Sequence, residues 1–145
     1  MSIGHQDFIA KTREWVGVEY HHQGASRYGC DCIGLIIGIL AELGIDYSSF
    51  DIPDRTERPN GNQFQSQIEL VCDAPAIRPP RAGDLALFKI YNEPQHCGII
   101  SDLGYSLGLI HADRSIGKVA ECVLSPQWEQ RLIAVYQIPY VTLDT

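Results

Sequence analysis

The chain has 145 residues, of which 45% are hydrophobic, and it carries a formal net charge of −7. This length and composition predict a single domain, residues 1–145, with a core of its own, while the negative charge argues against nucleic acid or an anionic membrane as a partner. Five cysteines without a disulfide spacing predict reduced thiols, and residues 1–17 lack the regions of a signal peptide, so we expect a protein that is cytoplasmic as synthesised.

The N-terminal segment predicts an amphipathic helix over residues 6–16. Four side chains fall on one face at helical spacing: Phe8, Thr12, Trp15 and Val16. Gly17 is placed to end this helix. Residues 18–29 then form an irregular approach to the next element.

The apolar segment of residues 32–43 predicts a helix that is buried on all sides, because isoleucines and leucines occupy every face. Small residues recur along one side: Gly34, Gly38 and Ala41. Another element can approach closely there. Asp31 precedes the helix as its N-cap, and Gly44 follows as the residue that ends it.

A surface loop is expected over residues 45–60, where prolines and charged side chains replace the apolar pattern. A second amphipathic helix should follow, because Phe64, Ile68 and Val71 recur at helical spacing. Three prolines then stop the helical pattern: Pro75, Pro79 and Pro80.

The second half of the chain changes to β-type patterns separated by short turns. Five strands are predicted, at residues 85–90, 96–101, 107–112, 118–123 and 132–138. The short turns are typical of an antiparallel meander, and one helical turn is expected from Ser125 and Pro126 to Arg131. Because helices precede strands, the predicted fold class is α+β, with the buried helix packed on a C-terminal antiparallel sheet.

Cys32 lies in the first turn of the buried helix, where the helix dipole and unpaired backbone N–H groups favour a thiolate. It is therefore a candidate nucleophile, provided that a base can reach it. Cys30 competes for this role but precedes the helix, so it gains less from the dipole. The other three cysteines are expected to be ordinary buried thiols: Cys72, Cys97 and Cys122.

His96 and His111 lie on neighbouring predicted strands, and alternation places His96, Gly98 and Ile100 on one face. If the buried helix packs on the histidine face, the two imidazoles meet Cys32. They would then act as the base and as the group that orients the base. From spacing alone, a structural role for each histidine remains the alternative.

A zinc site is the competing chemistry, and four side chains would supply its ligands: Cys30, Cys32, His96 and His111. Structural zinc sites usually have short paired spacings, which this set lacks. We therefore expect no metal site.

Tyr20 has two interpretations, as a packing aromatic or as a phenolic O–H that helps to hold an oxyanion or the substrate. Trp15 and Trp128 are expected to be packing aromatics. His21 and His22 are expected to be solvated histidines of the approach segment.

Short motifs follow one another at residues 17–20 (Gly-Val-Glu-Tyr), 31–35 (Asp-Cys-Ile-Gly-Leu), 83–85, 96–99 and 110–112. In this order they resemble the NlpC/P60 family of papain-like cysteine peptidases, which cut peptidoglycan stem peptides. Three longer motifs resemble the phage-encoded branch of cell-wall peptidases: residues 30–35, 95–99 and 128–134.

The resemblance implies that Cys32 is the nucleophile, His96 the base and His111 the third, orienting residue. It also implies an active-site role for Tyr20. The expected fold is papain-like, and the expected reaction is amide hydrolysis through an acyl-enzyme without a cofactor.

The resemblance further implies that Asp31 binds the D-glutamyl portion of the substrate, and the expected scissile bond joins γ-D-glutamate to the diamino acid. Commoner family members have a serine after the nucleophile, where this chain has Ile33, so one substrate contact should be missing. Expected partners are peptidoglycan and phage tail components. The alternatives are a non-catalytic tail assembly or binding module and an acyltransferase that uses the same triad.

Overall fold

The computed structural model describes residues 2–45, 61–72 and 74–142 of the chain. Helices dominate the N-terminal part and one antiparallel sheet dominates the C-terminal part, which confirms the α+β class. The expected loop over residues 45–60 lies, apart from Ile45, outside the described residues. None of the described helices is long and apolar enough to cross a membrane.

The N-terminal part contains the helices α1 (His5–Arg13), α2 (Cys32–Glu42) and α3 (Gly61–Val71). Short strands accompany them. β1 (Ile3–Gly4) pairs in parallel with β9 (Val141–Thr142), so the first and the last described strands lie side by side. β2 (Ala25–Ser26) pairs with β3 (Gly29–Cys30) just before α2.

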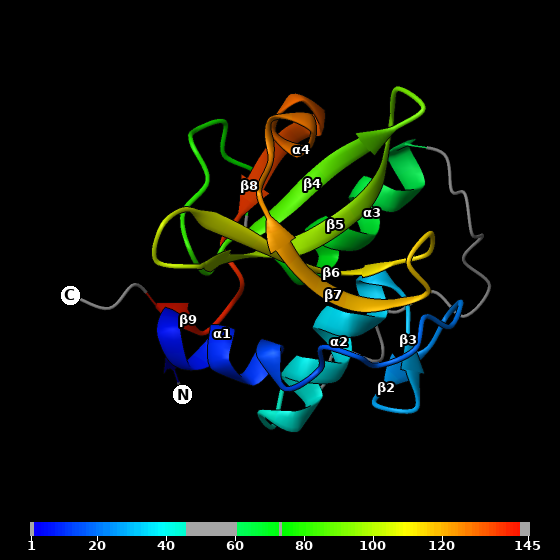
Figure 1. The fold of residues 1–145 in the computed structure, drawn as a ribbon, viewed down its shortest axis with the longest axis vertical. Coiled ribbons are helices and arrows are strands. Elements are labelled where there is room, and N and C mark those ends of the chain that lie inside the picture. The colour runs from blue at the N-terminus through cyan, green and yellow to red at the C-terminus, as the bar shows by residue number, and fades with distance from the viewer. Residues whose placement is uncertain (1, 46–60, 73, 143–145) are drawn as a thin grey trace.

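The main sheet contains β4 (Leu85–Ile90), β5 (Glu93–Asp102), β6 (Leu107–Asp113), β7 (Lys118–Val123) and β8 (Leu132–Tyr136). Its order is β7-β6-β5-β4-β8, and all neighbours are antiparallel. The first four strands form the predicted meander, but β8 pairs with β4 at the edge opposite to β7. The short helix α4 (Pro126–Arg131) is the helical turn predicted at this place, and it connects these two edges (Figure 1). Ser125 is its N-cap.

The two faces of the sheet pack against different helices. The face that carries Cys97, Ile99 and Ile110 shares a core with α1, α2 and α3, while Trp128 of α4 packs on the other face. Figure 1 shows α1 and α2 together on one side of the sheet and α4 on the other. Every isoleucine and leucine of α2 is at most 7% exposed, so the predicted burial on all sides is confirmed.

The small residues of α2 permit close packing. A Cβ on Gly38 would overlap the Trp15 ring and the Ala25 carbonyl oxygen, so only glycine fits there. Gly44 has φ +88° and ends the helix as predicted.

The helix α1 buries Phe8 and Thr12, and Trp15 in the following turn is also buried. Val16, predicted on the same face, is instead 45% exposed. The prediction was wrong at this residue because α1 ends at Arg13, and the chain then turns toward Gly17 at φ +99°.

Candidate active site

Cys32 is the first residue of α2, and Asp31 caps this helix as predicted. The Asp31 carboxylate accepts hydrogen bonds from the backbone N–H groups of Gly34 and Gln23, each at 2.8 Å. A Cβ on Gly34 would overlap the carbonyl of Gly24, so a glycine there lets the approach segment lie directly against the helix. The cap and the close packing together fix the position of the Cys32 backbone.

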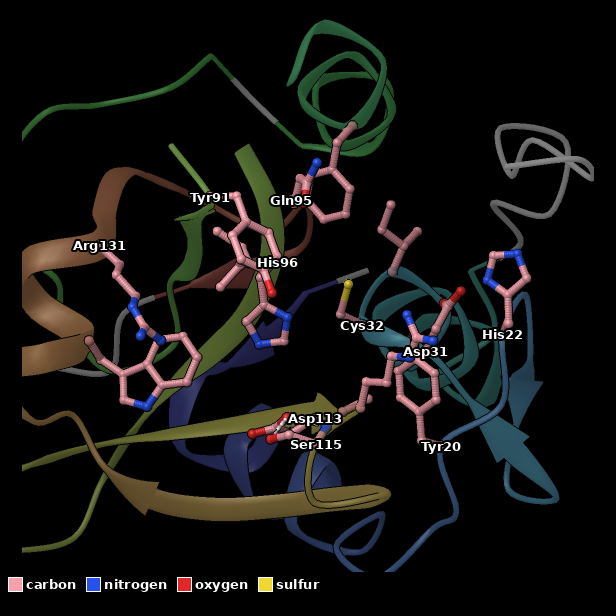
Figure 2. Close-up of a pocket in the computed structure, with 16 residues that line it drawn as sticks. Tyr20, His22, Asp31, Cys32, Tyr91, Gln95, His96, Asp113, Ser115 and Arg131 are labelled. Atoms are coloured by element: carbon pink, nitrogen blue, oxygen red, sulfur yellow. Dashed lines mark hydrogen bonds between the residues drawn. The ribbon is translucent and has the colours of Figure 1, made fainter. Parts of the chain in front are cut away.

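The sheet opens where the histidines lie. The register between β5 and β6 ends at the pair Ile99 and Ile110, whereas β5 continues beside β4 and β6 continues beside β7. His96 lies on β5 beyond Ile99, where only β4 pairs with it, and His111 follows Ile110 on β6, where only β7 pairs with it. The first turn of α2 lies at this opening, and Figure 2 shows Cys32 facing His96 across it.

The convergence arises by a different route from the predicted one. The helix α2 packs on the face of Cys97 and Ile99, not on the face that carries His96 and Ile100. Cys32 reaches His96 because β5 and β6 part beside the helix N-terminus. The condition under which the convergence was expected, that α2 packs on the histidine face, is therefore not met, yet Cys32 and His96 still meet.

The two imidazoles form a hydrogen-bonded pair, with His96 Nε2 2.8 Å from His111 Nδ1. Trp128 covers them, since its ring stacks on His96 at a centroid distance of 5.5 Å and meets His111 edge-on at 5.1 Å. Burial, together with the neighbouring His96, lowers the pKa of His111 to about 4. His111 is therefore neutral near pH 7, as suits a group that orients a base.

The cysteines around the site differ in ionisation. A hydrogen bond with Cys97 lowers the pKa of Cys32 most, and the hydrogen bond and charge of His96 lower it further, to about 5, against the effect of burial. The same hydrogen bond, together with burial, holds the pKa of Cys97 well above its ordinary value. Burial raises the pKa of Cys30 to about 12. Cys32 is thus the thiolate of this site, and Cys30 is a neutral buried thiol.

An open cleft of about 570 Å³ lies in front of the Cys32 sulfur. In Figure 2, Tyr20 and Asp31 lie at one end of the cleft, and Arg131 of α4 lies at the other. The guanidinium of Arg131 lies 5.1 Å from the ring of Trp128, which also lines the cleft.

Four of the five predicted site residues line this cleft: Tyr20, Asp31, Cys32 and His96. His111 lies behind His96 and is 1% exposed. The sequence analysis did not assign a role in the site to His22 in the cleft wall, Cys97 beside the thiolate or Trp128 over the imidazoles. It also missed the charged side chains of the cleft, which are Asp113, Arg114 and Arg131. Strand alternation held a signal for Cys97, because it placed this residue on the face opposite to His96, where α2 packs.

The described residues contain no group of three or more His, Cys, Asp or Glu side chains placed to hold a metal ion. Cys30, one of the four ligands of the zinc alternative, is 0% exposed. The zinc alternative thus finds no ligand set in the described part of the chain.

The model of the NlpC/P60 family matches residues 17–137, whereas no curated protein matches the chain. Among solved structures, the chain is similar to an NlpC/P60 family protein from Bacillus cereus ATCC 10987 (21% identity, TM-score 0.67, covering 95% of this chain and 41% of that one). It is also similar to a protein from Staphylococcus aureus subsp. aureus Mu50 described as similar to lipoprotein, NLP/P60 family (22%, 0.62, 97% and 42%). A third similar structure is the NlpC/p60 domain of the peptidoglycan hydrolase SagA (18%, 0.64, 94% and 100%). The chain spans about two fifths of the length of the first two.

Proposed function

The chain belongs to the NlpC/P60 family, and from that premise we propose that it is a cysteine peptidase that hydrolyses amide bonds in peptidoglycan stem peptides. One observation carries the proposal. A thiol of lowered pKa at a helix N-terminus faces an imidazole, which is itself hydrogen-bonded to a second, neutral imidazole, at the wall of an open cleft.

The residues support a two-step hydrolysis. The Cys32 thiolate attacks the carbonyl carbon, and the new C–S bond turns the carbonyl oxygen into an oxyanion. The Cys32 backbone N–H, which has no acceptor within the helix, and Tyr20 are the proposed donors to this oxyanion. His96 then protonates the leaving amine as the C–N bond breaks. Water deprotonated by His96 finally attacks the thioester, and the acid and the free thiolate are released.

The charges of the cleft support a zwitterionic peptide substrate. Asp31 and Asp113 contribute carboxylates, while Arg114 and Arg131 contribute guanidinium groups. The Asp31 carboxylate lines the cleft beside Cys32, and its negative charge suits the binding of a substrate ammonium. Because the chain as a whole is acidic, selectivity for an anionic wall peptide must come from such local groups.

We further propose the γ-D-glutamyl–diamino acid bond as the scissile bond. Ile33 presents an apolar surface to the cleft in place of a hydroxyl. The loss of one neutral hydrogen bond is worth about 0.5–1.5 kcal/mol, which is enough to relax selectivity but too little to abolish cleavage.

The test is digestion of purified sacculi, followed by identification of new amino termini, with Cys32→Ala as the inactive control. The free tripeptide L-Ala-γ-D-Glu-diaminopimelate should be cut faster than its N-acetylated form, and Asp31→Asn should narrow that difference. Better cleavage of sacculi and of the acetylated peptide would assign Asp31 to helix capping alone. If no stem peptide is cut while Cys32 still alkylates rapidly, the substrate assignment is wrong.

A phage origin with association to the virion tail is a further part of the proposal. It rests on the sequence motifs at residues 30–35, 95–99 and 128–134. Mass spectrometry of purified virions tests it, and a protein that never co-purifies with particles would contradict it.

A further inference from the structure

The hydrogen-bonded row that starts at the thiolate continues beyond His111 into β7. Cys122 Sγ lies 3.7 Å from His111 Nε2, while His111 Nδ1 lies 2.8 Å from His96 Nε2. The register pairs Cys122 with Leu109, which lies on the same strand face as His111, so the thiol is a diagonal neighbour of the ring.

We propose that Cys122 is a positioning residue, whose sulfur accepts the His111 Nε2–H and thereby holds the tautomer in which His111 Nδ1 accepts from His96. This inference rests on the proposed function, because it concerns the base of that same reaction. It adds a fourth member to the predicted set of Cys32, His96 and His111.

The tautomer of His111 decides whether His96 can work. A neutral imidazole carries one N–H, and its other nitrogen is an acceptor. When His96 holds the proton taken from Cys32, both of its ring nitrogens are donors, so His111 must present a lone pair at Nδ1. The N–H of His111 then lies at Nε2, where the sulfur of Cys122 is placed to accept it.

The opposite tautomer would oppose catalysis. With its proton on Nδ1, His111 would point an N–H at His96 Nε2, and the two N–H groups would face each other once His96 is protonated. The imidazolium, and with it the thiolate of Cys32, would lose stability. Cys122, the partner of His111 Nε2, thus influences the stability of the Cys32 thiolate through the imidazoles of His111 and His96.

The surroundings of Cys122 suit an acceptor. Burial, followed by the nearby charges of Asp113 and Glu121, raises its pKa, so the sulfur stays a neutral thiol with free lone pairs. Trp128 lies against the edge of His111. Burial of His111 keeps this ring neutral, which leaves one N–H to be placed.

Three substitutions separate hydrogen bonding from packing. Cys122→Ser keeps an acceptor, Cys122→Ala removes it and leaves space, and Cys122→Val removes it and fills the space with a residue suited to a strand. Val123→Ala changes the next residue of β7, whose side chain alternates to the opposite face and is 40% exposed, so it is the control for a substitution in this strand. Thermal unfolding shows that each variant is folded.

The measurements do not need a peptidoglycan substrate. Nitrogen-15 NMR of histidine-labelled protein reports the His111 tautomer, and the rate of Cys32 alkylation by iodoacetamide at mildly acidic pH reports the thiolate. We expect Cys122→Ala and Cys122→Val to shift the tautomer ratio and slow the alkylation by roughly twofold to tenfold, the size of one neutral hydrogen bond. Cys122→Ser and Val123→Ala should stay near the unmodified protein. With a peptide that the enzyme cleaves, the kcat of Cys122→Ala and Cys122→Val should fall while their KM stays constant.

Two results would overturn the inference. One is an unchanged tautomer and alkylation rate in folded Cys122→Ala and Cys122→Val, and the other is a Cys122→Ser variant that behaves like them. Failure of the proposed function has a different signature. In that case no stem peptide is cut, although the tautomer and the alkylation rate still respond to Cys122.

Discussion

Replacing Asp31 with alanine removes the two backbone hydrogen bonds that hold the first turn of α2 in place. The carboxylate is 5% exposed and accepts from Gly34 N–H and Gln23 N–H, both at 2.8 Å. The first bond caps the helix, and the second ties the approach segment to it. The substitution therefore tests how strongly the nucleophile is held by its own sequence neighbours.

The expected decrease in the free energy of unfolding can be estimated from these two hydrogen bonds. An N-cap replaced by alanine costs about 1 kcal/mol, and a hydrogen bond to a charged group contributes about 1.5–3 kcal/mol. Relief of the buried charge offsets part of the sum, so we expect Asp31→Ala to lower the free energy of unfolding by about 2–4 kcal/mol. For a chain of this size that corresponds to roughly 6–12 °C in Tm.

Urea and thermal unfolding of three variants provide the assay. Asp31→Asn keeps one oxygen acceptor but presents an N–H₂ group to the other donor, so its loss should be intermediate. Asp7→Ala is the matched control, because Asp7 lies in the first turn of α1 without capping that helix, and its loss should stay below about 1 kcal/mol. If Asp31→Ala destabilises the protein no more than Asp7→Ala, the two hydrogen bonds contribute nothing net and the reasoning is refuted.

His96→Ala should abolish nearly all peptidase activity, since a positioned general base contributes about 10²–10⁴-fold, whereas His111→Asn should keep a measurable part because its amide oxygen can still accept the His96 N–H. Equal, complete losses in two folded variants would contradict these separate roles. Iodoacetamide at mildly acidic pH should label Cys32 before Cys30, because the pKa of Cys32 is lowered to about 5 and that of Cys30 is raised to about 12; peptide mapping identifies the adduct, and preferential labelling of Cys30 would reverse the assignment. The fold should lose stability as the pH falls from 6.5 toward about 4, because burial lowers the pKa of His111 and the unfolded chain binds that proton first. Urea midpoints across this range should fall less steeply in His111→Asn, and equal slopes would show that His111 does not contribute.

The local pattern of the sequence was sufficient to predict α2, its Asp31 cap, its end at Gly44 and the position of Cys32 in its first turn. It also predicted the bounds of β4 and β7 as the structure has them. These features depend on residues only a few positions apart in the sequence, through helical or strand periodicity and capping. They can therefore be predicted without knowing which distant segments pack together.

Other features depend on which distant segments meet. Alternation showed that His96 and Cys97 point to opposite faces of the sheet. It did not show that α2 would pack on the Cys97 face and that Trp128 would cover the histidines on the other. Nothing local indicated that β8 would return to the edge beside β4.

The contact between Cys32 and His96 was decided by tertiary structure in the same way. It exists because β5 and β6 part beyond Ile99 and Ile110, next to the start of α2. The lowered pKa of Cys32 likewise comes from Cys97 and His96, far along the chain. Periodicity assigns each residue to a face of its own element, whereas the partner that covers the face is selected by packing of the whole core.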